Sequence, residues 1–184
     1  MIHADITWKL SDDGTLTISG TKMPDYQEVN SVDSNSPWYP QRDKIKKVVI
    51  KNGVTNIGSG AFRKCYEITS ITIPSSATNI GSNAFGSCSN LTSVTNLATT
   101  PQKIVDGTFS KYGTLHVLPG CKAKYEAADY WKKFTIVEDA KGSGTTGVAD
   151  VEADNDIKDG KYIIDGKVVI VRNGKKYKLN GIAE

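Results

Sequence analysis

The sequence predicts a mainly β chain with short helices, built as a solenoid of stacked coils with a cap at each end and a small β tail. The first observation is that residues 45–67 and 68–90 nearly repeat each other, with equivalent positions 23 residues apart. A fixed period in the twenties is the mark of a solenoid, in which each coil covers the apolar face of the next. The second observation is composition, since frequent glycine and only 8% aromatic residues suit a turn-rich β chain.

Each coil is expected to open with a strand and then to turn. Residues 68–73 alternate and are rich in β-branched side chains, which predicts a short strand. Pro74 ends this strand, because proline cannot donate a hydrogen bond to a sheet ladder. Gly81 permits the turn that follows, and the coil closes with Phe85 and Cys88, which we expect to lie in the interior.

The stacking of coils predicts columns of identical residues through the core. At the strand spacing of about 4.8 Å, Phe62 lies against Phe85 and Cys65 against Cys88. We interpret the two cysteines as members of one core column, with a disulfide between them as the alternative, because they are near enough to bridge. The chain holds three cysteines, so at least one is unpaired within it.

A third coil follows with less fidelity to the pattern. Leu91 and Val94 match the strand of the second coil, but Asn96 stands where that coil has an isoleucine. The turn and core positions then return one residue late, at Ile104, Gly107-Thr-Phe109 and Tyr112. Residues 115–117 are expected to form the last strand.

Both ends of the array carry segments that are expected to cover it. Residues 7–10 and 15–18 alternate around Asp12-Asp13-Gly14, which predicts a β-hairpin that closes the open end of the sheet. Residues 121–134 are predicted to form a helix, because Tyr125, Ala128 and Trp131 recur at a spacing of three on one side. That side would pack on the final coil.

The chain therefore divides into four expected regions: an N-terminal β cap over 1–42, the solenoid with its helical cap over 43–138, a linker over 139–156 and a small three-stranded β tail over 157–184. In the linker, residues 142–147 satisfy the dinucleotide-binding pattern G-x-G-x-x-G, but no hydrophobic helix follows and acidic residues come next, so no cofactor is expected. In the tail, Asp165-Gly166 and Asn173-Gly174 favour tight hairpin turns.

If the array binds a partner, the outward strand positions are the candidate site. Small hydroxyl side chains dominate these positions and would make a flat surface that can accept a protein. A sheet face that is merely solvated is the alternative interpretation. The candidate residues form two columns, with Val49, Thr72, Thr95 and His116 in one and Lys47, Ser70 and Ser93 in the other.

Two other groups of residues invite a functional interpretation. Trp38 and Tyr39 either pack over the first coil or form an aromatic platform for a sugar or a peptide. Four aspartates near the start of the chain suggest calcium, but their spacing lacks the order of a known calcium loop, so no metal is expected. These aspartates are Asp12, Asp13, Asp25 and Asp33.

Composition and motifs exclude several classes of protein. His3 and His116 stand alone in sequence, apart from any plausible set of nucleophile and acid, so no catalytic residue is expected and we predict that the protein is not an enzyme. The net charge of +3 is mild and unclustered, which argues against nucleic acid as a partner. No apolar run approaches the roughly 18 residues of a membrane helix, and the first residues lack the features of a signal peptide.

The repeat unit resembles a known family. Residues 68–88 read Ile-Thr-Ser-Ile-Thr-Ile-Pro, then Ile-Gly, Ala-Phe and Cys, which is similar to the BspA-like, or Treponema pallidum-type, leucine-rich repeat of Bacteroidetes surface proteins. The segments 14–20, 23–26 and 36–39 resemble the entry of such proteins, and 115–134 resembles their exit. The resemblance spans about residues 8–138 and implies a leucine-rich-repeat solenoid.

The resemblance also implies a place and a role. Members are secreted or attached to the cell surface of bacteria, commonly of gut and oral anaerobes such as Bacteroides, and several are described as adhesins. We therefore expect a secreted or cell-surface protein-binding module whose partner is a host extracellular-matrix protein or a bacterial surface protein. A structural spacer whose tail serves export or attachment is the alternative, and a carbohydrate-binding module built on Trp38 and Tyr39 is a third. The identity of the ligand and the oligomeric state stay open.

Overall fold

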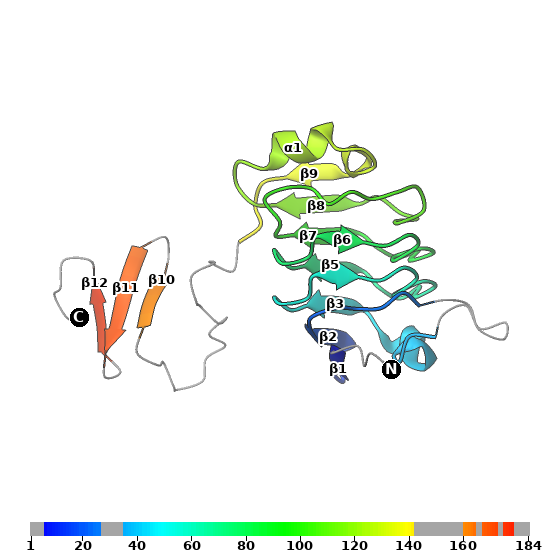
Figure 1. Ribbon diagram of the computed structural model, residues 1–184, viewed down its shortest axis with the longest axis horizontal. Coiled ribbons are helices and arrows are strands. Elements are labelled where there is room, and N and C mark those ends of the chain that lie inside the picture. Colours follow the sequence, from blue (N-terminus) through cyan, green and yellow to red (C-terminus); the bar gives the residue numbers. More distant parts are fainter. Residues whose placement is uncertain (1–5, 27–34, 142–159, 165–166, 173–174, 179–184) are drawn as a thin grey trace. The chain divides into compact units, whose positions relative to one another are not determined.

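The computed structural model of the protein describes residues 6–26 and 35–141, together with the backbone of three strands between residues 160 and 178. The chain divides into two compact units, Met1–Ala140 and Lys141–Glu184, which we describe one at a time. Figure 1 shows the first unit as a stack of coils, and this confirms the solenoid predicted from the repeat.

The first unit is built on a seven-stranded sheet to which each coil contributes one strand, in the order β1-β2-β3-β5-β7-β8-β9. The first pair is antiparallel and all later pairs are parallel, as expected when the same coil geometry recurs. Each parallel strand alternates buried and partly exposed residues, so one face of the sheet lines the core. The strands are β1 (Ile6–Leu10), β2 (Thr15–Gly20), β3 (Lys47–Ile50), β5 (Ser70–Ile73), β7 (Ser93–Asn96), β8 (Thr114–Val117) and β9 (Thr135–Val137).

A second, two-stranded sheet lies away from the first on the same coils. Its strands are β4 (Asn56–Ile57) and β6 (Asn79–Ile80), which pair in parallel. The pairing is reinforced by the side chains, because the amide of Asn79 donates a hydrogen bond to the side-chain oxygen of Asn56 at 2.6 Å. The sequence indicated only a turn here, because two-residue strands have no periodicity that would predict them.

Aromatic rings form the spine of the core. Phe62 and Phe85 lie 5.3 Å apart between ring centroids and are nearly parallel, which confirms the column predicted from the repeat. Phe109 continues the stack at 4.9 Å from Phe85, so the return of the pattern one residue late in the third coil is also confirmed. Trp38 closes the column at one end and Trp131 at the other.

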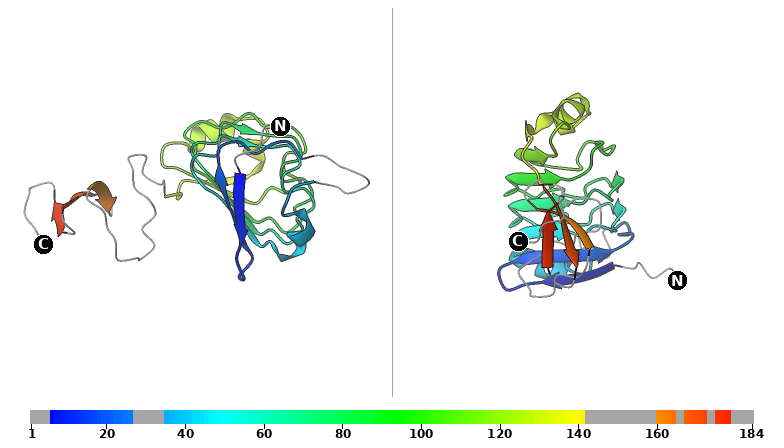
Figure 2. Two further views of the ribbon diagram at one scale, coloured as in Figure 1. Left: turned by 60° about the horizontal axis from the view of Figure 1, so that its bottom comes forward. Right: turned by 90° about the vertical axis from the view of Figure 1, so that its left-hand side faces the viewer.

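The predicted N-terminal hairpin is present. β1 and β2 pair with Leu10 opposite Leu16, and Gly14 takes the positive φ of 85° that the turn requires. The Asp13 carboxylate accepts hydrogen bonds from the Ser11 hydroxyl and from both the backbone N–H and the hydroxyl of Thr15. These donors hold the pKa of Asp13 below its ordinary value. The left view of Figure 2 brings this end of the stack forward and shows β1 in front.

The predicted helix over 121–134 is only partly correct. The α-helix α1 (Lys122–Ala127) ends at Ala127. Ala128 is extended, and Tyr130 takes a positive φ of 64° before a short 3-10 helix at Trp131–Lys133. This break turns the Trp131 side chain into the core, where its indole N–H donates to the backbone oxygen of Gln102 at 2.8 Å. The chain then adds β9, a strand that the sequence analysis missed.

Another 3-10 helix, at Tyr39–Lys44, carries the chain into the first coil. In the second unit, β10 (Gly160–Ile164), β11 (Lys167–Arg172) and β12 (Lys175–Lys178) form an antiparallel meander. This agrees with the three strands predicted for the tail. The predicted linker over 139–156 lies outside the described residues from residue 142 on, and so do the two predicted tight turns.

Candidate functional site

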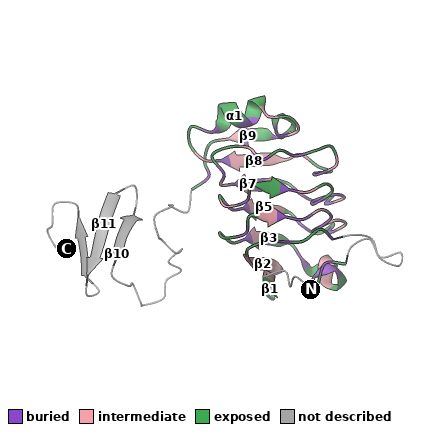
Figure 3. Ribbon diagram, viewed as in Figure 1, coloured by how far each residue is buried: buried purple, intermediate pink, exposed green. Residues whose placement is uncertain are grey.

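The outer face of the large sheet brings the predicted columns together. Val49 pairs with Thr72, Thr72 with Thr95, and Thr95 with His116, each on neighbouring parallel strands. In the second column Lys47, Ser70 and Ser93 are likewise neighbours. Lys47 is exposed and the other members are partly exposed, so both columns are accessible (Figure 3).

The columns extend further than the sequence analysis predicted. The same registers add Thr114 and Thr135 to the lysine-serine column at its far end, and Val137 next to His116. At the near end Thr15 and Thr17 pair with Lys47 and Val49. The alternation in residues 15–18 was a signal for these outward positions, but it was used only to predict the hairpin.

The centre of this face carries no charge. Residues 68–102 contain no lysine, arginine, aspartate or glutamate, so both middle strands present only hydroxyl groups outward. Hydroxyls both donate and accept hydrogen bonds and cost little to desolvate compared with charges. We define the hydroxyl face as Ser70, Thr72, Ser93, Thr95 and Thr114.

A hydrogen-bonded pair, His116 and Asp139, borders the hydroxyl face on one side. The Nδ1 atom of His116 lies 2.7 Å from the Oδ1 atom of Asp139, with the imidazole 27% exposed and the carboxylate 59% exposed. Asp139 was assigned to the linker from its composition, so its proximity to His116 was not predicted. A neutral imidazole that donates from Nδ1 to the carboxylate keeps Nε2 as an acceptor.

Of the two interpretations of Trp38 and Tyr39, the structure confirms packing over the first coil and contradicts the aromatic platform. Trp38 is fully buried and Tyr39 is 8% exposed. The Trp38 ring stacks on Phe62 at 5.4 Å, and its indole N–H donates to the backbone oxygen of Ala61 at 2.9 Å. These residues complete the end of the core, so they present no ring face to a sugar.

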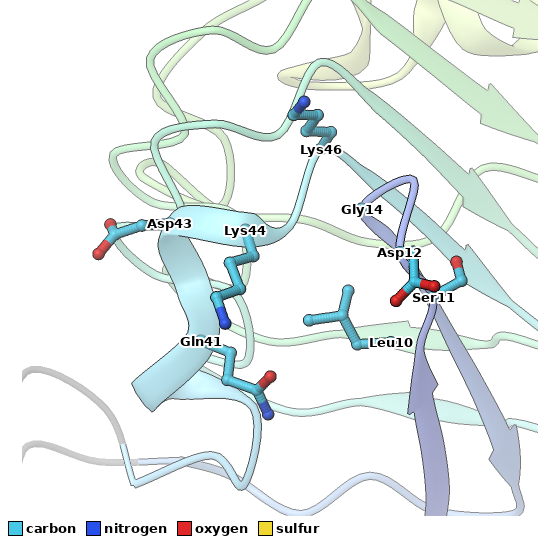
Figure 4. A pocket seen from close by; sticks show the side chains of 8 residues that line it. All are labelled: Leu10, Ser11, Asp12, Gly14, Gln41, Asp43, Lys44 and Lys46. Carbon is cyan, nitrogen blue, oxygen red and sulfur yellow. The ribbon is translucent and has the colours of Figure 1, made fainter.

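A polar hollow of about 400 Å³ lies between the hairpin turn and the 3-10 helix at Tyr39–Lys44. Figure 4 shows Gln41 and Lys44 on one side of it and Leu10 and Asp12 on the other, while Asp43 points away. Its walls are mostly polar and no aromatic side chain lines it.

Catalytic and metal chemistry find no assembled site in the part of the chain that the structure describes. His116 and Asp139 form a pair, but no hydroxyl among the described residues is hydrogen-bonded to the imidazole as a nucleophile would be. No group of three or more potential ligands among those residues is placed to hold a metal ion. Of the calcium candidates, Asp25 accepts a hydrogen bond from the Ser59 backbone N–H, and Asp33 falls outside the described residues.

The cysteines are buried thiols. Cys65 and Cys88 lie in the same core column and neither is in a disulfide. The Cys88 thiol donates to the backbone oxygen of Phe62 at 3.3 Å. Burial raises the pKa of the Cys65 thiol, and it raises that of Cys88 to about 12, so both are unreactive at neutral pH.

Comparison with known proteins adds the following. A family model described as the BspA type leucine rich repeat region matches residues 35–120, with six copies. The chain is similar to the crystal structure of a leucine-rich repeat protein from Eubacterium ventriosum ATCC 27560, with 26% sequence identity and a TM-score of 0.47. The match covers 97% of this chain and 47% of that one, so the chain spans about half the length of that protein. A search of curated proteins gave no match. Within the described residues, no helix has the length and apolar character needed to cross a membrane.

Proposed function

Because this chain belongs with the BspA-type leucine-rich repeat proteins, which its repeat region at residues 35–120 identifies, we propose that it is a protein-binding module that uses the hydroxyl face. The single observation that supports this most is the register of the large sheet, which sets Thr72 beside Thr95 and Ser70 beside Ser93. Stacked repeats suit such a role, since they create extended surfaces for partners.

The chemistry of the hydroxyl face indicates the kind of contact. A partner surface rich in backbone and amide groups can exchange hydrogen bonds with these hydroxyls, and the methyl groups of the threonines add apolar contact. Lys47 on one side and the Asp139 carboxylate beside His116 on the other supply the charges that orient a partner.

The finer proposal concerns location and partner. We propose a secreted or cell-surface protein with an adhesin-like role toward a host extracellular-matrix protein or a bacterial surface protein. The support is the family to which the repeat region belongs, in which proteins are typically secreted or exposed at the surface. The shape and hydrogen bonding of a preformed face would carry this function without catalysis.

The test is binding of the purified chain to immobilised fibronectin, laminin and collagen, with Thr72→Glu and Thr95→Glu as variants. Each substitution places a carboxylate in the centre of the hydroxyl face, where a partner would have to desolvate it. We expect a loss of binding of tenfold or more, because a desolvated unpaired charge costs at least about 1.4 kcal/mol.

The matched control is Thr100→Glu, which adds the same charge at an exposed position outside the strands of the sheet. It should leave binding unchanged. Equal effects of the three substitutions would reject the hydroxyl face as the site. Unchanged binding by both Thr72→Glu and Thr95→Glu would reject it as well. No binding to the three matrix proteins would reject the host-matrix proposal and leave bacterial surface proteins to be tested in the same format.

A structural role is the second proposal. The division of the chain into two compact units supports a solenoid that acts as a spacer and a tail that serves export or attachment. Deletion of residues 157–184 tests this role of the tail separately from binding. Loss of surface display with matrix binding intact favours the role, whereas unchanged display opposes it.

A further inference from the structure

The two ends of the large sheet are finished differently. At the C-terminal end, β9 is followed by chain that is tied back to the unit, since the Glu138 side chain accepts from the backbone N–H of Lys122 and the backbone N–H of Ala140 donates to the oxygen of Val117. At the N-terminal end β1 is the last strand of the sheet, and in the described part of the chain it pairs with β2 alone.

Hydrogen bonding shows which groups of β1 face outward. The backbone N–H of Ser11 donates to the oxygen of Thr15, and the register places these two residues opposite each other. In an antiparallel pair, hydrogen-bonded and non-bonded residues alternate. The odd-numbered residues of β1 therefore bond to β2, and the backbone groups of Ile6, Trp8 and Leu10 point to the free edge.

The side chains of the same three residues are incompletely covered. Ile6, Trp8 and Leu10 lie on the core side of the sheet and pack against the core, but each is only partly buried. Trp8 contacts the end of the aromatic spine, with its ring centroid 6.4 Å from that of Trp38. The free backbone groups and the uncovered apolar row thus belong to the same residues.

We propose that this edge pairs with β1 of a second copy of the chain, antiparallel and centred on Trp8. That register is self-complementary: Trp8 lies opposite its own copy, and Ile6 lies opposite Leu10 of the other chain, so both apolar rows face each other. Each outward backbone N–H and C=O of the three residues then gains a partner. The two sheets become one continuous sheet across a twofold axis.

Charge on the outer face agrees with this register. Thr7 and Lys9 are both exposed, and the pairing places Lys9 opposite Thr7 of the other copy rather than opposite another lysine. A register shifted by one residue would place the apolar side chains of one copy opposite the exposed side chains of the other.

The experiment is sedimentation velocity of the full chain from low micromolar to near-millimolar concentration, with Thr7→Lys and Thr7→Glu. Wild type should show a reversible monomer–dimer equilibrium, weak because a single strand pair buries little area. Thr7→Lys places a lysine opposite Lys9 twice by symmetry and should weaken the dimer by about twofold to thirtyfold, while Thr7→Glu should strengthen it by a similar factor.

The matched controls are Thr135→Lys and Thr135→Glu, which add the same charges to the exposed position on the strand at the other end of the sheet. They should leave the equilibrium as in wild type. A chain that stays monomeric throughout overturns the proposal. A dimer on which the two Thr7 variants act equally overturns it as well, because then another surface makes the contact. Circular dichroism of the Thr7 variants checks that the monomer fold is kept.

Discussion

The second and third coils of the solenoid have the same strand and core positions but treat the far side of the coil differently. In the second coil, β6 pairs with β4 through backbone hydrogen bonds, and the Thr78 hydroxyl donates to the backbone oxygen of Thr55. In the third coil no strand forms in the described stretch 97–113. A buried side-chain pair, Asn96 and Gln102, stands there instead.

This pair replaces the missing strand. The Gln102 amide nitrogen donates to the backbone oxygen of Ala77 at 2.9 Å, and the Asn96 amide donates to the Gln102 side-chain oxygen at 2.8 Å. The Asn96 side-chain oxygen in turn accepts from the backbone N–H of Ala98. Two buried amides are thus satisfied without water, which is the condition for placing them in a core.

Backbone carbonyls of the third coil that bond to no further coil are then available to the cap. The Tyr125 hydroxyl donates to the oxygen of Ala98 at 2.9 Å, and the Trp131 indole donates to that of Gln102. The Lys124 ammonium reaches the oxygen of Thr99 at 3.2 Å. The array therefore ends at a coil that forms no strand on its far side. Side chains of the cap can then bond to backbone carbonyls that would otherwise pair with another coil.

The largest effect is expected from the feature that the two coils share. Phe85→Ala removes a fully buried ring that stacks on Phe62 and on Phe109, so it should cost about 3–5 kcal/mol of unfolding free energy. Urea denaturation measures this, and Phe85→Leu, which keeps most of the volume, should cost about 1 kcal/mol. A loss below about 1 kcal/mol for the alanine variant would contradict a continuous spine.

Glycine substitutions are expected to cost different amounts of stability in the second and third coils. A Cβ at Gly81 would lie 2.4 Å from the Ser59 backbone nitrogen, so Gly81→Ala forces two backbones apart and should cost about 3 kcal/mol. At Gly107 a Cβ would meet only the Asn83 side chain, at 3.2 Å, and the cost of about 1 kcal/mol comes from the positive φ of 82°. Equal thermal shifts of the two variants would argue against tighter backbone packing between the regular coils.

The polar pair is tested by Gln102→Leu. This change leaves the Asn96 side-chain NH2 group and the Ala77 carbonyl without their partners in the core, and it should cost about 2 kcal/mol. The double variant Gln102→Leu with Asn96→Ile should cost less than the sum of the single variants, because it removes the unsatisfied amide. Additive costs, measured in a denaturation cycle, would show that the two side chains do not act together.

The smallest effect is expected from Tyr125→Phe, which removes the bond to Ala98 and should cost about 1 kcal/mol at neutral pH. Burial raises the Tyr125 pKa, and it raises that of Tyr26 to about 12 from 10. A raised pKa in the folded state gives stability that is complete below pH 10 and is lost as pH rises through the folded value. Tyr125→Phe should therefore flatten the decline above pH 10, and an unchanged decline would contradict the role of this hydroxyl.

Much of the solenoid could be predicted because it repeats. Ile71 and Ile73 occupy the same positions in the second coil as Val48 and Ile50 in the first. This equivalence specifies both the strands and their register, and it also located the outward columns. Asp139 could not be placed beside His116 in the same way, since nothing in a single charged residue after the last repeat indicates which strand it will contact. The end of α1 at Ala127 was missed for a related reason, because the spacing of Tyr125, Ala128 and Trp131 fits a helix locally.

The sequence by itself determined the period, the strands and the residues that stack in the core, because each coil must bury the same apolar positions against its neighbour. The tertiary structure alone decided how the stack ends. It buried Trp38 and Trp131 as covers of the spine, broke the predicted helix so that Trp131 could reach Gln102, and left β1 and β9 as the two edge strands of the sheet in the described chain. Repetition carries information about neighbours, whereas an end is set by contacts between segments that share no pattern.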